Sequence, residues 1–171
     1  MESWERTGRA WAVVDLVEHA NQCEGVAEFV NVDAPELLMD GDMPALLNRQ
    51  LALHGYAPIE DREGNEPRFA RLIFESLARR YAEVIHDLEG LLGKRIERIH
   101  VLGGGSRNHA LTRLTEKYAG VPVEAGNVEG STIGNFAVQL AAADANEGQL
   151  KKSEIRAWAV RLSGASAESA G

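Results

Sequence analysis

Apolar residues recur every three or four positions over much of the chain before Gly93, which is typical of amphipathic helices. The clearest stripe predicts a helix from about Glu66 to Leu92, ended by Gly93. A shorter stripe predicts a helix from Met43 to His54, and a broader one predicts a helix over residues 1–20. The inward positions of the long helix are Phe69, Leu72, Ile73, Leu77, Tyr81, Val84, Ile85, Leu88 and Leu91.

Turn-forming residues separate the first two of these helices along the chain. Pro35 and Pro44 suit the first turn of short helices. Backbone N–H groups in that turn have no acceptor within the helix, so the N–H that proline lacks is not missed there. Asp33, together with Asp40 or Asp42, is the expected source of helix caps.

The pattern changes after Gly93 to strand, helix, strand, helix. The strands are expected at Arg95–Leu102 and Val121–Ala125, the first helix reaches about Tyr118, and the second starts near Ser131. A right-handed crossover makes the strands parallel neighbours, but two strands leave both edges of the sheet open. The fold class is therefore α/β and helix-rich, with a short parallel sheet. The inward positions of the last helix are Ile133, Phe136, Ala137, Leu140 and Ala143.

A change of composition near residue 150 suggests two parts. Residues 1–150 form the expected domain, and residues 151–171 hold one charged helix followed by a tail. The tail from Ser163 to Gly171 consists mostly of serine, alanine and glycine, so we expect it to be disordered.

Composition excludes several classes of protein. The 171 residues carry 26 acidic against 18 basic side chains, a formal charge of −8, so nucleic acid is not an expected partner. No apolar run approaches the length of about 18 residues that could cross a bilayer, and the N-terminal segment shows no secretory signal, so we expect a cytoplasmic protein without a membrane partner. Cys23 has no second cysteine with which to form a disulfide or a cysteine-rich zinc site.

The titratable residues suggest neither a metal centre nor a catalytic group. The five histidines, His19, His54, His86, His100 and His109, lack the spacings that bind zinc. The aspartates fall in expected helical or loop surface without a phosphate-binding turn beside them, so we assign no catalytic residue and no metal ligand.

The candidate site is a glycine turn between an apolar strand and a helix. Gly103, Gly104 and Gly105 lack a Cβ and so allow a ligand to approach the backbone, and the following helix start directs N–H groups outward. Ser106 and Asn108 supply short polar groups for a ligand or for capping. The alternative is that the glycines only end the strand and the polar residues only cap the helix.

A dinucleotide-binding motif is a weaker interpretation of the same turn. Gly103 and Gly105 fit its first two positions, and Glu124 lies roughly 20 residues further on, where such motifs bind ribose. Asn108 stands where the third glycine is needed. A Walker loop is excluded, because the chain contains no Gly-Lys-Ser or Gly-Lys-Thr.

These residues resemble the C-terminal domain of FGGY carbohydrate kinases. The resemblance covers about residues 26–145 and is strongest after Arg68. It rests first on Ile99–Asn108, Leu111, Gly120–Val123 and Glu129–Gly134. Three upstream segments resemble the rhamnulokinase branch in particular: Val32–Leu38, Gly41–Pro44 and Phe74–Tyr81. Arg113 and Leu114 stand near the place where the family usually has glutamine.

The resemblance implies part of an actin-like ATPase (ribonuclease H-like) fold and an ATP-dependent sugar kinase. In that family the glycine turn lines the adenine and ribose end of the ATP site, which carries over to Gly103, Gly104, Gly105, Ser106 and Asn108. The implied reaction transfers a phosphoryl group from ATP, with Mg²⁺ in the complete enzyme, to a ketose such as L-rhamnulose.

The resemblance also implies that this chain is inactive alone. The family's phosphate hairpin, sugar pocket and catalytic aspartate belong to chain that would precede Met1. The expected partners are an adenine nucleotide and either that N-terminal half or a second copy, which would pair through the open sheet edge. The alternative function is a non-catalytic remnant that serves as a binding or interaction module, and a dinucleotide-binding module is the less favoured third.

Overall fold

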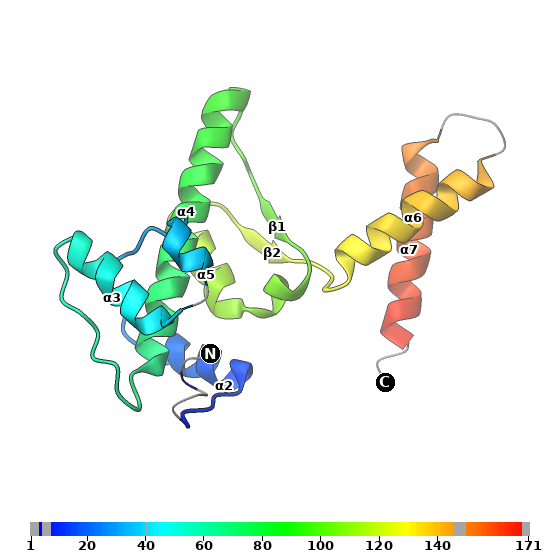
Figure 1. Ribbon diagram of the computed structural model, residues 1–171. Coiled ribbons are helices and arrows are strands. Elements are labelled where there is room, and N and C mark those ends of the chain that lie inside the picture. The colour runs from blue at the N-terminus through cyan, green and yellow to red at the C-terminus, as the bar shows by residue number, and fades with distance from the viewer. Residues whose placement is uncertain (1–3, 5–7, 40, 146–149, 169–171) are drawn as a thin grey trace. The chain divides into compact units, whose positions relative to one another are not determined.

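The computed structural model describes residues 4, 8–39, 41–145 and 150–168 (Figure 1). The chain divides into two compact units. The first consists of Met1–Ile99 and Asn108–Val123, and the second of His100–Arg107 and Glu124–Gly171. These units are defined by contacts between segments, a different criterion from the composition that suggested the parts 1–150 and 151–171.

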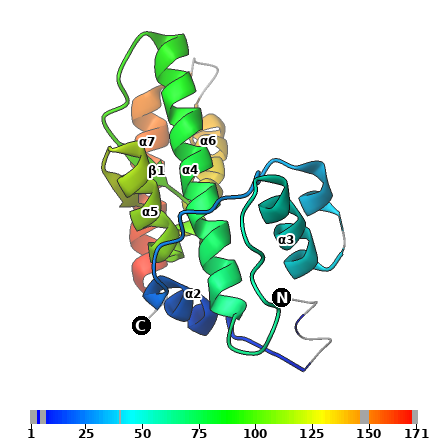
Figure 2. The same cartoon turned by 90° about the vertical axis from the view of Figure 1, so that its left-hand side faces the viewer.

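The first unit is organised around one long helix, α4 (Glu66–Leu92), which has the predicted bounds. Pro67 occupies its first turn, and Gly93 ends it in the left-handed conformation at φ 61°. Helices α2 (Val13–Gln22) and α5 (His109–Ala119) lie against α4 (Figure 2). The largest fully buried apolar side chains of the core are Phe69, Leu47, Leu51 and Leu72.

Burial along α4 stops at Ala78. All buried residues of this helix lie in its first half, from Glu66 to Ala78. The apolar stripe nevertheless continues to Leu91, and four of its members, together with the adjacent Leu92, are at least 40% exposed: Tyr81, Val84, Leu88 and Leu91. The second half of α4 therefore presents an apolar face that nothing in the described residues buries.

The prediction of a helix across residues 1–20 was wrong in extent. Residues 9–12 are not helical, and α2 begins only at Val13. Gly8 has φ 78°, a left-handed conformation that interrupts a helix and that glycine adopts without strain. Trp4 still reaches the core, where it is 7% exposed and its ring lies 6.1 Å from that of Phe69.

Both prolines open helices as predicted. Pro35 begins the 3₁₀ helix η1 (Pro35–Leu38), and Pro44 lies in the first turn of α3 (Met43–Leu53). Asp42 occupies the cap position of α3, but its side chain caps no N–H within the described residues. Ala34 rather than Asp33 precedes η1, and the Asp33 carboxylate forms an ion pair with Arg80. Asp40 lies outside the described residues.

The sheet has two parallel strands in the described part of the chain, β1 (Ile99–Val101) and β2 (Val123–Ala125). The Ile99 N–H donates to the Pro122 carbonyl at 3.0 Å in the first unit, and the Gly126 N–H donates to the Val101 carbonyl at 2.8 Å in the second. The expected strand Arg95–Leu102 is thus much shorter, and Leu102 is 53% exposed instead of entering an interior. Two short strands do not form the wide sheet, covered by helices on both faces, in which parallel strands are usually buried.

The rest of the second unit is a helix pair. Helices α6 (Gly130–Asp144) and α7 (Lys152–Glu168) lie against each other, and the Trp158 Nε1–H donates to Asp144 Oδ2 at 2.9 Å. Phe136 was predicted to face inward but is 53% exposed. The buried positions of α6 are Ile133, Ala137 and Ala141, four residues apart, and this narrow row of mostly small side chains leaves Phe136 outside it.

The C-terminal segment is more helical than expected. We expected disorder from Ser163, whereas α7 continues to Glu168. Alanine is the strongest helix former, and the segment contains two alanines before Glu168, so a continued helix is compatible with its composition. The remainder of the expected tail, residues 169–171, lies outside the described residues.

Candidate functional site

The glycine turn follows β1 directly, and its first glycine is required by the backbone. Gly103 has φ 76°, and its carbonyl accepts bonds from the Ser106 N–H at 3.0 Å and from Ser106 Oγ at 2.7 Å. The Gly103 N–H donates to the Asn127 carbonyl at 3.3 Å. Ser106 is 4% exposed, so Gly103 and Ser106 serve the turn itself.

The other two glycines have no such requirement. Gly104 and Gly105 are exposed, and neither has a positive φ. A Cβ placed on Gly104 would meet no atom within 4 Å, and one on Gly105 would approach only Val101 Cγ1, at 3.9 Å. The fold would therefore accept a side chain at both positions. Their lack of one leaves the backbone of the 3₁₀ helix η2 (Gly104–Arg107) open to close approach from outside.

Asn108 caps α5, as one of the two predicted cap residues. Its Oδ1 accepts the Leu111 N–H at 3.0 Å, which satisfies a free donor at the helix start. Asn108 belongs to the first unit, whereas Gly103, Gly104, Gly105 and Ser106 belong to the second. The structure thus brings four of the five predicted site residues together in one turn.

Two further glycines help to position this turn, and the sequence analysis missed them. A Cβ on Gly126 would collide with Leu102 Cδ2, and one on Gly130 would lie 3.3 Å from the same atom. Leu102 immediately precedes Gly103, so a side chain at either position would force the leucine side chain beside the turn to shift. The sequence feature that could have identified these two glycines is their location, one directly after a strand and the other at the start of a helix.

The acidic residue of the dinucleotide interpretation has a partner in the sheet. Glu124 on β2 lies beside His100 on β1, with 3.4 Å between Oε2 and Nδ1. The position of the third glycine is held by Asn108, whose side chain is used by the cap. Glu124 and Asn108 therefore both have partners within the protein.

A buried polar cluster joins α4 to α5 in the first unit. Glu75 is fully buried and accepts bonds from Arg71 Nη2 at 2.7 Å, from Arg71 Nε at 3.1 Å, and from the Tyr118 hydroxyl. Burial opposes the ionisation of Glu75, but the hydrogen bonds from Tyr118 and Arg71 outweigh it and lower the pKa of this carboxyl below its ordinary value. No local pattern in the sequence indicates that this glutamate is buried.

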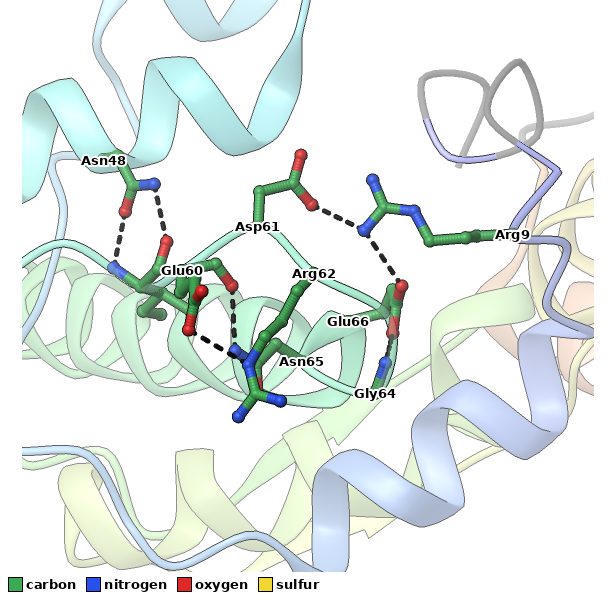
Figure 3. A network of polar contacts seen from close by, with 9 residues as sticks. Arg9, Asn48, Glu60, Asp61, Arg62, Gly64, Asn65 and Glu66 are labelled. Carbon is green, nitrogen blue, oxygen red and sulfur yellow. Dashed lines mark hydrogen bonds and ion pairs between the residues drawn. The ribbon is translucent and has the colours of Figure 1, made fainter.

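A second polar network fixes the loop before α4 (Figure 3). The Arg9 guanidinium lies 2.8 Å from Asp61 Oδ1 and 3.2 Å from Glu66 Oε1. The Asn48 amide bonds the backbone N–H and carbonyl of Ile59, each at 2.8 Å. These contacts hold the loop in place before α4.

The described residues contain no group of three or more histidine, cysteine, aspartate or glutamate side chains that could hold a metal ion. Cys23 is a half-buried free thiol. No helix in the described ranges combines the length and apolar character needed to span a membrane.

Comparison with known proteins agrees with the resemblance seen in the motifs. Residues 9–143 match the C-terminal domain of the FGGY family of carbohydrate kinases. A rhamnulokinase of Bacteroides thetaiotaomicron is 36% identical over 125 residues, which are 73% of this chain and 25% of that protein. The chain thus spans about a quarter of the length of the curated relative it matches.

Proposed function

This chain belongs to the FGGY family of carbohydrate kinases, and from that premise we propose that it is the nucleotide-side portion of an ATP-dependent sugar kinase of the rhamnulokinase type. The domain has the actin-like ATPase type of fold, here helix-rich with a short parallel sheet. The proposed reaction transfers a phosphoryl group from ATP to a ketose such as L-rhamnulose.

The observation that carries this proposal is the pair of glycines that the fold does not need. Gly104 and Gly105 have ordinary backbone conformations and open space where a Cβ would lie. A flat ligand lying across the turn would use that space, and the adenine and ribose of ATP have the required shape. Gly103 and Ser106 would keep the turn rigid, and Asn108 would fix the start of the next helix.

The chain's residues fit the nucleoside of ATP better than its phosphates. Phosphoryl transfer needs a bound Mg²⁺, an in-line acceptor and a base for the attacking hydroxyl. The described residues offer no cluster suited to the metal. We therefore propose that Mg²⁺ and the reacting groups are held by the part of the kinase that corresponds to the other three quarters of the relative, and that this chain alone is inactive.

A polypeptide with that remaining part is the proposed partner. The apolar second half of α4 and the open edges of the two-stranded sheet are surfaces that a larger domain would cover. A second copy of this chain is the alternative occupant of the sheet edge. A cytoplasmic location stays a prediction.

The experiment that tests the nucleotide site is a titration of the chain with ATP, followed by the backbone amide signals in NMR spectra. We expect shifts centred on Gly104 and Gly105, with an affinity of about millimolar, because an open turn buries only part of the ligand. Gly104→Val should weaken binding by about tenfold or more, since a branched side chain would occupy the nucleoside position.

Gly90→Val is the matched control, because a Cβ at Gly90 also meets nothing within 4 Å and this glycine lies on α4, in the first unit. It should leave ATP binding unchanged. If Gly104→Val keeps its fold and binds ATP as well as the parent does, the turn is only a strand end. Binding of NADH without binding of ATP would favour the dinucleotide alternative.

An interaction module without catalysis is the second candidate function. The exposed apolar residues of α4 favour it, because such a stripe on a protein surface usually marks a contact with another chain. The ATP titration distinguishes the two candidates, because only a kinase portion should bind ATP.

A further inference from the structure

The first unit contains a cleft that shares no residue with the glycine turn. Its volume is about 440 Å³, within the range of about 300 to 1,000 Å³ that small-molecule sites occupy. One wall is the segment Phe29–Val32, which crosses α4 (Figure 2) and is fixed there by a 3.0 Å bond from the Val30 N–H to Ser76 Oγ. The other walls are α4, through Arg79, Arg80, Ala82 and Glu83, and Tyr118 of α5.

Arg79 is the unusual group in this cleft. Its guanidinium carbon lies 5.3 Å from the ring centre of Phe29 and 5.1 Å from that of Tyr118. Nη1 donates to the Ala27 carbonyl at 3.2 Å, and Nη2 makes longer contacts with the Val26 carbonyl, at 3.5 Å, and Tyr118 Oη, at 3.4 Å. Nε is removed from solvent and has no acceptor in the described structure.

The charge of Arg79 lacks a carboxylate partner among the described residues, in contrast to its neighbours. Arg80 pairs with Asp33 and with Glu83. The nearby carboxylate of Glu75 is already bound by Arg71 and by the Tyr118 hydroxyl. This guanidinium lies between two aromatic rings and has no counterion among the described residues, so it could form charge-assisted hydrogen bonds with an anion.

The other residues that line the cleft indicate which class of ligand it could bind. The cleft is lined by two arginines against one glutamate, in a chain whose formal charge is −8. Apolar surface comes from Phe29, Val30, Val32 and Ala82. Sites of this composition bind small molecules that present one acidic group to the cation and an apolar or planar body to the walls.

We propose that this cleft binds a small organic anion, whose acidic group lies at Arg79 and whose apolar body lies against Phe29 and Tyr118. The site is separate in its residues from the glycine turn and does not depend on the kinase function. Binding there would tie the Phe29–Val32 segment more firmly to α4 and α5, because the ligand would contact all three.

The test uses phenyl phosphate as the probe and the ¹⁵N-labelled full chain. The Nε–H signal of Arg79 and the amide signals of Val30, Asn31 and Val32 should shift together and saturate. Arg79→Gln should weaken phenyl phosphate binding by about tenfold or more. Arg80→Gln is the matched control, since that arginine lines the same cleft but is already paired, and we expect a loss below about threefold.

Two simpler probes separate the contributions to binding. Inorganic phosphate lacks the apolar body and benzyl alcohol lacks the charge, so both should bind more weakly than phenyl phosphate. Phe29→Leu keeps the cation and should weaken phenyl phosphate but not inorganic phosphate, which keeps the proposal testable if Arg79→Gln fails to fold. Gly104→Val should bind phenyl phosphate as the parent does.

The proposal is overturned if phenyl phosphate leaves the Arg79 Nε–H signal unmoved, or if a folded Arg79→Gln chain binds the probe as well as the parent. Equal affinity for phenyl phosphate and benzyl alcohol would also overturn it, because the cation would then contribute nothing.

Discussion

Glu75 and the glycine turn show what the sequence reveals about single residues. Three consecutive glycines between an apolar strand and a helix start are visible in the sequence, because the conformational freedom of glycine and the position of the turn are both local properties. The burial of Glu75 is not visible, because its partner Tyr118 is 43 residues away. Distinguishing Gly103, which needs its positive φ, from Gly104, which does not, also required the structure.

Glu75→Gln should destabilise the chain at neutral pH. The substitution leaves the Arg71 guanidinium buried without its counterion, which costs about 3 kcal/mol in comparable sites. Because folding lowers the pKa of Glu75, its contribution is present above the ordinary carboxyl pKa and is lost as the pH falls through the folded value. The difference in unfolding free energy between parent and variant should therefore shrink as the solution is acidified below about pH 4.5.

Urea unfolding at several pH values measures this difference. Glu83→Gln, an exposed glutamate on the same helix, is the control and should change the unfolding free energy by less than about 0.5 kcal/mol. Equal stability of the parent and Glu75→Gln at pH 7 would show that the buried cluster contributes nothing.

Helices and strands differed in how well they could be predicted as elements. The bounds of α4 follow from local features, namely its apolar period, Pro67 in the first turn and Gly93 at the end. The strands were predicted too long, because the length of a strand depends on neighbours that the chain must supply from elsewhere. The inward position of Phe136 was wrong for a related reason, since only the packing partner decides which side of an apolar helix is buried.

The double substitution Leu88→Glu with Leu91→Glu tests the exposed apolar face of α4. These leucines are 42% and 83% exposed, so we expect less than about 1 kcal/mol of change in unfolding free energy. Binding of the dye ANS, which reports exposed apolar surface, should fall by about half or more. His86→Glu, another exposed position of the second half of α4, should leave dye binding unchanged.

A loss of several kcal/mol in the leucine variant would mean that this face is already covered. Helical content measured by circular dichroism should stay constant in all three chains, because glutamate is a good helix former.

At the scale of the whole molecule, the described residues leave several surfaces uncovered. Among the described residues are a two-stranded sheet with open edges, a helix with an apolar second half, and a glycine turn whose second and third glycines are exposed. The family and the general fold could be predicted because the motifs near the turn are specific. The division into two units could not, because it depends on contacts between segments far apart in the sequence.

The most direct test of the proposed kinase function is a complementation assay. The chain is mixed with a polypeptide that contains the remaining three quarters of the Bacteroides thetaiotaomicron rhamnulokinase, and ADP formation from ATP is followed with L-rhamnulose present. We predict no turnover from either polypeptide alone, turnover from the mixture, and a loss of about tenfold or more when the chain carries Gly104→Val. A mixture that forms a complex but stays inactive, or one that is equally active with Gly104→Val, would contradict the account.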